Sequence, residues 1–343
     1  MNLREGKKRV TLADISREAG VSVPTVAKVI SGCRSNICVS VATAERIREI
    51  AMRLHYRPNL NAKALAGTSI KMIGVLVDTC SAMISVRLVG HIESAAAAND
   101  YRVIVGEAHD SPQNLFECYE HMQQSSVDGV IILSHEYPQK RDEIHAYFRN
   151  CRNTVIIGDN YVPELPCVKV ERSNAVREAF AALQEGGRKR LGMYHLDNGE
   201  LYFGFQCMKR TLRECDPNFQ YYSVASCHNE DELQKMTSDV IDNFILREKL
   251  DGLFCPNDYY AAALLQQLAE RGIRVPQDIA VIGWDNDLFA PFMQPSLSTV
   301  DERVAEVGKQ AFFLLKNLME NRESPAEAAQ IKIPAQFIRR KSI

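Results

Sequence analysis

The sequence predicts an all-α helix-turn-helix headpiece followed by an α/β core of two lobes, each built on a doubly wound parallel sheet. Three observations support this fold class. Residues 11–32 have the spacing of two short helices joined by a tight turn, and residues 1–70 are basic whereas the rest is acidic. From residue 70 onward, apolar runs typical of buried parallel strands alternate with amphipathic stretches, the pattern of sheets covered by helices.

The segment TLADISREAGVSVPTVAKVISG, residues 11–32, is the most informative stretch. Thr11 is suited to cap the first helix, and Gly20 to end it in a left-handed conformation. Ser22 would cap the second helix, whose first turn contains Pro24, where the missing N–H costs nothing. Such a second helix presents its N-terminal end to the major groove of DNA. A buried helical hairpin has the same apolar stripe and is the structural alternative.

The charge of the chain is divided unevenly. Residues 1–70 contain 12 Lys and Arg against 5 Asp and Glu, a net of +7, and the remainder contains 29 against 38, a net of −9. A basic head on an acidic body is typical of a DNA-binding part joined to a separate regulatory part. Chance clustering is the alternative, but the basic segment coincides with the helix-turn-helix.

A third helix and a linker are expected after the helix-turn-helix. Residues 41–55 have a helical apolar stripe, and Ser40 is suited to cap them. Pro58 breaks this helix, and residues 59–66 have the length of one short helix. Because two helical turns alone are marginal in water, this helix is expected to fold only when DNA or a partner supports it.

The core is expected to contain two series of alternating strands and helices. At 343 residues, the chain is long enough for two or three domains. The predicted strands are residues 72–78, 101–108, 128–134, 154–159, 190–195, 220–225, 251–256 and 279–284, with two short strands near the end. The predicted helices are residues 85–98, 112–125, 139–149, 173–185, 201–214, 230–248, 258–271 and 302–320. Two series imply two lobes with a ligand cleft at the carboxyl ends of the strands.

Several other classes of protein lack support in the sequence. The ten cysteines form no CxxC motif, so reduced thiols in a cytoplasmic protein are expected, and no signal peptide or run of 18 apolar residues is present. No phosphate-binding loop, GxGxxG, GxSxG or HExxH motif occurs. We therefore expect no enzyme activity, no cofactor and no metal site. The scattered histidines are His91, His109, His121, His135 and His145.

Six motifs occur along the chain: VTLADISREAGVSVPTVAKVISG, YRPNLNAKALAG, IGVLV, VDGVIIL, FCPNDYYAAALLQQLAERGIRVPQDIAVIGWDN and PSLSTVDERVAEVGKQA. In this order they resemble transcriptional regulators of the lactose-repressor (LacI/GalR) family over almost the whole length. The resemblance implies a headpiece, a hinge helix and a periplasmic-binding-protein-like core. It also implies a homodimer on a pseudo-palindromic operator, with a small-molecule effector, such as a sugar, between the lobes.

The domain boundaries follow from the pattern and the resemblance together. The headpiece is expected over residues 1–57, the hinge helix and linker over 58–70, and the effector-binding and dimerisation core over 71–343. Within the core, we expect a first lobe of residues 71–170 plus 301–330 and a second lobe of residues 171–300 plus 331–343. A solute-binding protein shares such a core, but it would carry an export signal and no headpiece.

The resemblance places base-reading side chains at Val23, Pro24 and Lys28. Lys28 is suited to donate to guanine, with a phosphate contact as the alternative. Leu65 matches the family's minor-groove leucine, an apolar wedge that kinks DNA, with packing between hinge helices as the alternative. Lys63 matches a basic hinge position. The other expected DNA-contacting residues are Thr11, Ser22, Thr25, Arg34, Asn36 and Asn59.

The expected effector contacts lie at strand ends. Asp258 matches the family's effector-binding aspartate and can accept two hydroxyl donors, although capping of the helix at 259–271 is the alternative role. Asp159 is a second acid at a strand end. Trp284 is suited either to stack on a sugar ring or to fill the space between the lobes. Asp285 is expected to bond loop amides.

At three places the chain departs from the family pattern. Leu201 occupies a position where arginine is common, and Met83 lies where Asn-Pro-Phe is usual. The acid-asparagine pair at the crossover is replaced by Glu171-Arg172, and Arg172 is either a substitute cation or a surface residue. These changes predict a less polar pocket than a typical sugar site and leave the ligand class open. The expected mechanism is effector closure of the lobes that orders or frays the hinge helices, whereas the sign of regulation stays open.

Overall fold

The computed structural model describes most of the chain in two compact units, Met1–Ile70 and Lys71–Ile343. The described residues are 10–31, 37–57, 68–78, 83–109, 111–133, 137, 140–158, 162–196, 203–227, 229–320 and 329–343. The boundary between the units falls where the sequence pattern changes from helical to alternating. Within the described residues, no helix is both long enough and apolar enough to span a bilayer.

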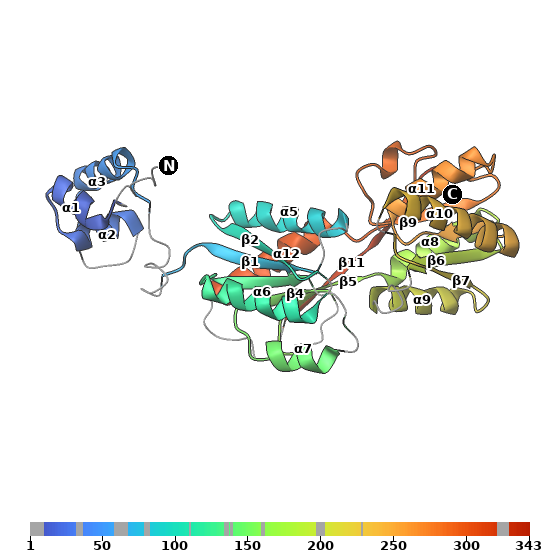
Figure 1. Ribbon diagram of the computed structural model, residues 1–343, viewed down its shortest axis with the longest axis horizontal. Helices are drawn as coiled ribbons and strands as arrows, with labels where there is room; N and C mark the ends of the chain where they lie inside the picture. Colours follow the sequence, from blue (N-terminus) through green and yellow to red (C-terminus); the bar gives the residue numbers. More distant parts are fainter. Residues whose placement is uncertain are drawn as a thin grey trace, which may run out of the picture. The chain divides into compact units, whose positions relative to one another are not determined.

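The first unit contains three helices, α1 (Leu12–Ala19), α2 (Val23–Ser31) and α3 (Val41–Arg53) (Figure 1). They enclose a small core in which Ile15, Val26 and Ile47, one from each helix, are fully buried. This arrangement buries the apolar stripes of all three helices against one another. The predicted three-helix headpiece is therefore confirmed.

The capping residues predicted from the sequence are confirmed. Thr11 and Asp14 form a reciprocal capping box at the start of α1. Gly20 ends α1 with φ 63°, a left-handed conformation in which a glycine has no Cβ to strain. The Ser22 hydroxyl accepts from the backbone N–H of Thr25 at 3.3 Å, and Ser40 caps α3. These local bonds fix the angle of the turn between α1 and α2.

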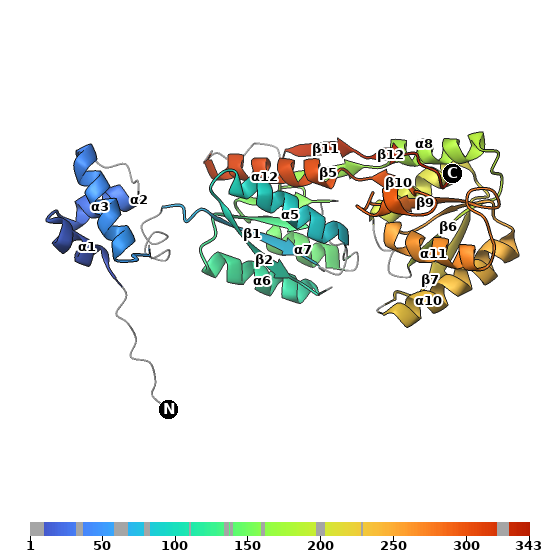
Figure 2. The same cartoon turned by 90° about the horizontal axis from the view of Figure 1, so that it is seen from above.

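The first lobe of the second unit is built on a parallel sheet in the order β11-β5-β4-β3-β1-β2. Helices α5 and α12 pack on one face of this sheet, and α6 and α7 on the other (Figures 1 and 2). Its strands are β11 (Gln330–Pro334), β5 (Cys167–Glu171), β4 (Thr154–Ile157), β3 (Gly129–Leu133), β1 (Met72–Val77) and β2 (Arg102–Glu107). Its helices are α5 (Met83–Ala97), α6 (Pro112–Gln124), α7 (Arg141–Phe148) and α12 (Val304–Glu320). Burial on both faces explains the near-continuous apolar strands.

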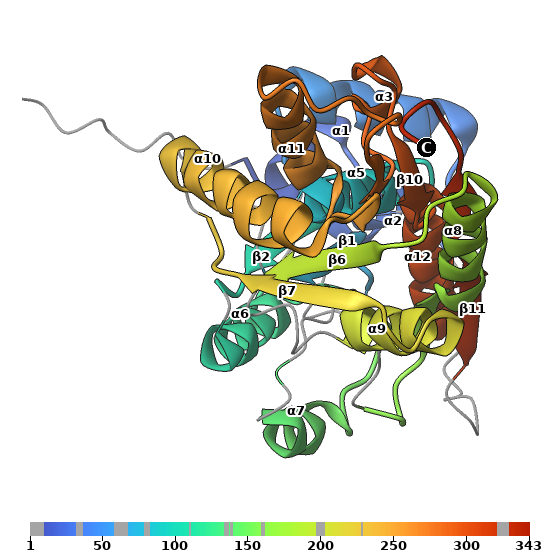
Figure 3. The same ribbon diagram turned by 90° about the vertical axis from the view of Figure 1, so that its right-hand side faces the viewer.

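The second lobe repeats this plan with the strand order β12-β10-β9-β8-β6-β7. All its pairs are parallel except β10 with β12. Its strands are β12 (Gln336–Ile338), β10 (Ser298–Asp301), β9 (Ala280–Trp284), β8 (Gly252–Phe254), β6 (Leu191–Leu196) and β7 (Gln220–Val224). Its helices are α8 (Ser173–Glu185), α9 (Phe203–Cys215), α10 (Glu230–Asp239) and α11 (Asp258–Glu270), which cover the two faces in the pairs α8 with α9 and α10 with α11 (Figure 3).

Three segments cross between the lobes. The chain passes from β5 to α8, returns from β10 to α12, and passes again from β11 to β12. The expected assignment of residues 331–343 to the second lobe is therefore wrong at its start. Strand β11 belongs to the first sheet, where it pairs with β5 and buries Ile333. The crossing point lies at residues 334–336, because the parallel pairing with β5 extends to Pro334.

The observed elements differ from the expected ones mainly at these crossings. Strands β5 and β10 were not predicted, because both are short and each pairs on one side with a strand that comes much later in the sequence, β11 and β12 respectively. The expected helix at residues 230–248 is divided into α10 and a π-helical segment, Val240–Leu246. The remaining predicted helices and strands of the lobes are present, with ends shifted by at most two residues.

Candidate functional site

The N-terminal end of α2 is presented to solvent. Val23 is 41 % exposed and Pro24 is exposed, whereas Val26 on the opposite side is fully buried in the headpiece core. The Ser22 and Thr25 hydroxyls lie 2.8 Å apart and bond to each other, which fixes the first turn of the helix. This exposed turn has the geometry of a recognition helix, which inserts its N-terminal residues into the major groove.

Lys28 lies half-buried on the same helix. Its ammonium group donates a hydrogen bond to the backbone carbonyl of Ile37, in the segment before α3. To reach a base or a phosphate, the ammonium group must leave this carbonyl, so the guanine contact stays a prediction. Five other expected DNA-contacting residues lie outside the described part of the chain: Arg34, Asn36, Asn59, Lys63 and Leu65.

The second unit contains a cavity of 240 Å³ at the carboxyl edge of the second sheet. The cavity lies at the ends of β6, β8, β9 and β10, the edge at which open parallel sheets bind ligands. Two of its lining residues, Arg172 and Glu302, belong to segments that cross between the lobes. The lining residues are Arg172, Met193, His195, Leu196, Phe205, Met208, Pro256, Asn257, Trp284 and Glu302.

Glu302 organises the polar wall of this cavity. Its Oε1 accepts from Arg172 Nε at 2.6 Å and from Trp284 Nε1 at 2.9 Å, and its Oε2 accepts from Arg172 Nη2 at 3.1 Å. Burial disfavours the charged carboxylate, but the charge and hydrogen bonds of Arg172 outweigh burial and lower the pKa of Glu302. The wall therefore carries an ionised, bidentate ion pair that also fixes the indole ring of Trp284.

His195 and Phe205 form the opposite, aromatic part of the lining. Their ring centroids lie 4.6 Å apart, and His195 is 4 % exposed. His195 Nδ1 lies 3.1 Å from the carbonyl oxygen of Leu196, which can only accept, so this nitrogen carries the proton in that bond. The imidazole is therefore held in one orientation at the end of β6.

The structure brings Trp284 and Arg172 together at the cavity, and their contact with an effector remains a prediction. The ring of Trp284 lines the cavity while its indole N–H donates to Glu302. This geometry is compatible with both roles expected for Trp284, stacking on a ligand ring and filling space between the lobes. Met83, at the start of α5, is 51 % exposed and is not among the cavity-lining residues. Asp159 and Leu201 lie outside the described residues.

The capping role considered for Asp258 is wrong, and Asp258 is not among the cavity-lining residues, so its contact with an effector stays a prediction. Asn257 caps α11, since its Oδ1 accepts from Tyr260 N at 3.1 Å. Asp258 is fully buried, and its two oxygens accept from the backbone N–H of Asp287 and the hydroxyl of Thr299, both at 2.7 Å. A Cβ on Gly283 would collide with the Asp258 carboxylate. The carboxylate is thus a buried structural acceptor, and Asn257 lines the cavity instead.

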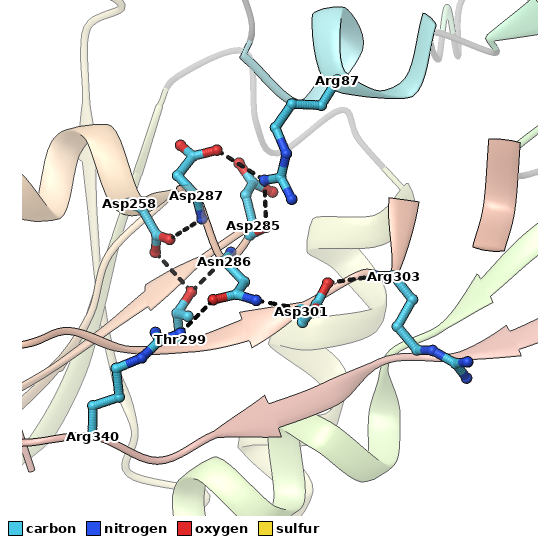
Figure 4. A network of polar contacts seen from close by, with 9 residues as sticks. All are labelled: Arg87, Asp258, Asp285, Asn286, Asp287, Thr299, Asp301, Arg303 and Arg340. Carbon is cyan, nitrogen blue, oxygen red and sulfur yellow. Dashed lines mark hydrogen bonds and ion pairs between the residues drawn. The ribbon is translucent and has the colours of Figure 1, made fainter. Parts of the chain in front are cut away.

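A polar network around the β9–β10 edge fixes the loop that follows Trp284 (Figure 4). Asp285 and Asn286 have φ values of 94° and 48°, in the left-handed region. Asn286 donates to Asp301 Oδ2 at 3.1 Å and accepts from Arg340 Nη2 at 2.7 Å. The Asp285 carboxylate was expected to accept hydrogen bonds from loop amides. In the structure, the Asp258 carboxylate accepts from a loop amide instead, the backbone N–H of Asp287. Burial, with nearby carboxylates adding to it, raises the pKa of Asp285 well above its ordinary range.

Among the described lining residues, the sequence did not predict three polar ones, Glu302, His195 and Asn257, or the apolar ones other than Trp284. His195 ends a predicted strand and Asn257 precedes a predicted helix, so strand-end position was the available signal for both. Glu302 follows β10, which was itself not predicted. No group of three or more metal-binding side chains lies together within the described residues.

Comparison with known proteins agrees with this geometry. Residues 11–59 match the model of bacterial regulatory proteins of the lacI family, and residues 204–343 match a periplasmic binding protein-like domain. The chain is 27 % identical to the HTH-type transcriptional regulator pepR1 of Lactobacillus delbrueckii subsp. lactis, covering 98 % of both chains. It is 26 % identical to the HTH-type transcriptional repressor PurR of Vibrio atlanticus (strain LGP32), covering 91 % of this chain and 93 % of that protein.

Among solved structures, the fold is similar to that of a lac repressor dimer bound to operator and the anti-inducer ONPF. The TM-score is 0.82 at 20 % identity, covering 98 % of this chain and 99 % of that chain. The similarity extends over headpiece and core, and the named relatives are transcriptional regulators, not enzymes. With its exposed recognition helix and two-lobed core, the chain belongs to the lacI family of bacterial regulatory proteins and is a DNA-binding transcriptional regulator.

Proposed function

We propose that this protein is a homodimeric repressor in the bacterial cytoplasm whose affinity for an operator is set by a small molecule in the core cavity. The observation that carries the proposal is the pairing, in one chain, of an exposed recognition helix with a cavity whose walls include two crossover residues, Arg172 and Glu302. One feature supports DNA reading, and the other supports control of that reading.

DNA recognition is assigned to the first turn of α2. Val23 and Pro24 offer apolar contacts, for example to a thymine methyl group, and Lys28 offers a donor once it leaves Ile37. Most of the affinity is expected from Lys and Arg side chains that neutralise phosphates, so binding should weaken steeply with salt. Specificity then depends on few base contacts.

Control by an effector is supported by the position of the cavity. Arg172 lies between β5 and α8, and Glu302 lies between β10 and α12, so both belong to segments that join the lobes. A ligand that contacts these residues has a different affinity for each lobe arrangement. Differential affinity of this kind is what allows a ligand to shift a conformational equilibrium.

Dimerisation is supported by exposed apolar side chains on both lobes. Leu288 and Phe292 are 79 % and 82 % exposed, and Tyr259 is 52 % exposed. Tyr259 and Leu288 belong to neighbouring segments, because Asp258, next to Tyr259, accepts from the N–H of Asp287, next to Leu288, and Phe292 follows four residues later. We assign this patch, with Met83 and Val86 of α5, to contact with a second copy. The related lac repressor is a dimer on its operator.

The test begins with selection of bound duplexes from a random DNA library by the full-length protein. The affinity of the selected duplex and of a scrambled duplex is then measured by fluorescence anisotropy at several salt concentrations. The proposal predicts a two-fold symmetric selected site, bound at least about a thousandfold more tightly than scrambled DNA. Equal affinity for both duplexes at every salt concentration would contradict it.

A further inference from the structure

We infer that the cavity binds a compact, uncharged ring compound of aryl or heteroaromatic type, and not a polyhydroxylated sugar. The inference rests on the proposed function, because it names the chemical class of the effector. It is carried by three properties of the cavity: its apolar lining, the mutual engagement of its polar groups, and its volume.

Most of the lining is apolar and soft. The apolar residues are six of the ten lining residues in the described part of the chain: Met193, Leu196, Phe205, Met208, Pro256 and Trp284. Aromatic rings gain contact area and favourable edge and face geometry against Phe and Trp, and thioethers of Met add favourable contacts with ring edges. A sugar would place its hydroxyl groups against these same walls.

The polar side chains of the lining are already engaged in hydrogen bonds, either with one another or with nearby backbone groups. Arg172 and Trp284 both donate to Glu302, Asn257 Oδ1 accepts from Tyr260, and His195 is bonded to a carbonyl. Apart from a hydroxyl that accepts from the Asn257 carboxamide nitrogen, each sugar hydroxyl would have to displace one of these bonds or stay without a hydrogen-bond partner. Because each buried polar group left without a partner weakens binding, several hydroxyl groups together are strongly disfavoured.

The charge of the wall disfavours a charged ligand. Arg172 and Glu302 form a bidentate pair, 2.6 and 3.1 Å between donors and acceptors, so the pair carries no net charge. An anion would compete with Glu302 for Arg172, and a cation would compete with Arg172 for Glu302. Breaking a buried pair leaves one uncompensated charge, which is strongly unfavourable.

The remaining polar capacity suits a single acceptor on a ring. The carboxamide nitrogen of Asn257 is not engaged in the hydrogen bonds found among the described residues, so it can donate to a ring nitrogen or carbonyl oxygen. The cavity volume of 240 Å³ is below the range of about 300–1,000 Å³ typical for drug-sized ligands. One or two fused rings therefore match the available space.

The test uses Trp284, the single tryptophan of the chain, as a reporter in the cavity wall. The full-length protein is titrated with indole, nicotinamide and 4-hydroxybenzaldehyde, and in parallel with D-ribose, D-glucose and cellobiose. Trp284 emission and the melting temperature are followed together, because a ligand of the native state raises the melting temperature. We expect saturable changes in both readouts with at least one ring compound and none with the sugars.

A matched pair of variants controls the result. Leu196→Asn places an amide in the half-buried wall and should weaken ring binding at least about tenfold, since a polar group replaces apolar contact. Leu246→Asn makes the same change at a side chain that is 51 % exposed and not in the lining, and should leave binding unchanged. Equal weakening by both variants would place the ring compound elsewhere and contradict the inference.

The outcomes separate the inference from the proposed function. Saturable binding of a sugar, or no saturable response to any ring compound up to its solubility limit, overturns the assignment of the ligand class. If a sugar binds and changes operator affinity, the proposed function stands and the inference fails. If a ring compound binds the cavity and operator affinity is unchanged, the ligand class stands and the proposed control fails.

Discussion

Arg87 and Asp287 form an ion pair that joins the two lobes directly. Arg87 Nη1 on α5 lies 2.9 Å from Asp287 Oδ1 and 2.9 Å from the carbonyl oxygen of Asp285, in the loop that follows β9 (Figure 4). The side chains are 18 % and 3 % exposed. The pair therefore ties the helix that carries Met83 and Val86 to the loop that carries Leu288 and Phe292.

The first prediction concerns the strength of this pair. Arg87→Ala should lower the free energy of unfolding by about 3 kcal/mol, because it leaves the nearly buried Asp287 carboxylate without its cation. A double-mutant cycle with Asp287→Ala, followed by chemical denaturation, should give a coupling energy of about 1–3 kcal/mol. The exposed pair Arg274 and Asp278 is the control, with a much smaller expected coupling because water screens its charges. Equal couplings in the two cycles would contradict the assignment of a lobe-joining bond.

The second prediction concerns base recognition by Lys28. Lys28→Ala should weaken binding to the selected operator about 10- to 100-fold while changing affinity for scrambled DNA much less, because a base contact carries sequence information. The measurement is anisotropy on both duplexes at one salt concentration. Melting of the variant is followed in parallel, since Lys28 also bonds Ile37. Equal losses on both duplexes would identify a phosphate contact instead.

The third prediction concerns pH and Asp258. Burial raises the pKa of Asp258 to about 6, although bonds from Thr299 and Asp287 act against it. Because the native state holds this proton more tightly than the unfolded chain does, its contribution to stability is present at low pH and is lost as pH rises through about 4 to 6. Asp258→Asn cannot titrate and so does not lose this stability. The free energy of unfolding of the variant minus that of the wild type should therefore rise by about 2–3 kcal/mol between about pH 4 and pH 7.5.

The control for this titration is Asp278→Asn. Hydrogen bonds from Arg274 lower the pKa of Asp278 to about 2, so its ionised form contributes stability above its unfolded pKa and loses it as pH falls. This loss occurs below about pH 4, between the unfolded and the folded pKa of Asp278. Between about pH 4 and pH 7.5, the stability difference between Asp278→Asn and the wild type should therefore stay nearly constant, whereas that of Asp258→Asn should rise. A pH-independent difference between Asp258→Asn and wild type would show that Asp258 does not titrate as described.

The fourth prediction concerns the dimer. Phe292→Asp should raise the dimer dissociation constant at least about tenfold, because it places a charge in an apolar contact. Operator affinity should fall with it, since two half-sites are then no longer bound together. Sedimentation velocity over a concentration series measures the first effect. Leu246→Asp is the control, at an exposed position outside the patch, and should sediment as the wild type does.

The fold was predictable because its signals are local. Helix α8 begins and ends where its apolar periodicity predicted, and Gly20 ends α1 in the left-handed conformation that its position implied. Strands β5 and β10 were not predictable in the same way. Each is four or five residues long and is held between two other strands, one of which comes much later in the sequence, so its stability comes from tertiary pairing and not from its own pattern.

The candidate site was predicted less completely for a related reason. Trp284 was identified from its strand-end position and Arg172 from its departure from the family pattern, but the sequence alone does not reveal that Glu302 bonds to both. The exchange of roles between Asn257 and Asp258 has a geometric cause. Side chains at adjacent helical positions point about 100° apart. Because Asn257 caps α11, its side chain points to the cavity and that of Asp258 points away from it. The Arg87 and Asp287 pair joins residues 200 positions apart.

The central claim is that the core cavity controls reading of DNA by α2. The most direct test measures operator affinity of the full-length protein by anisotropy at fixed salt, with and without a saturating amount of the ring compound that gives the largest melting shift. We predict a change in operator affinity of about 5- to 150-fold, with affinity for scrambled DNA unchanged. Saturation of the cavity, reported by Trp284, with no change in operator affinity would contradict the account.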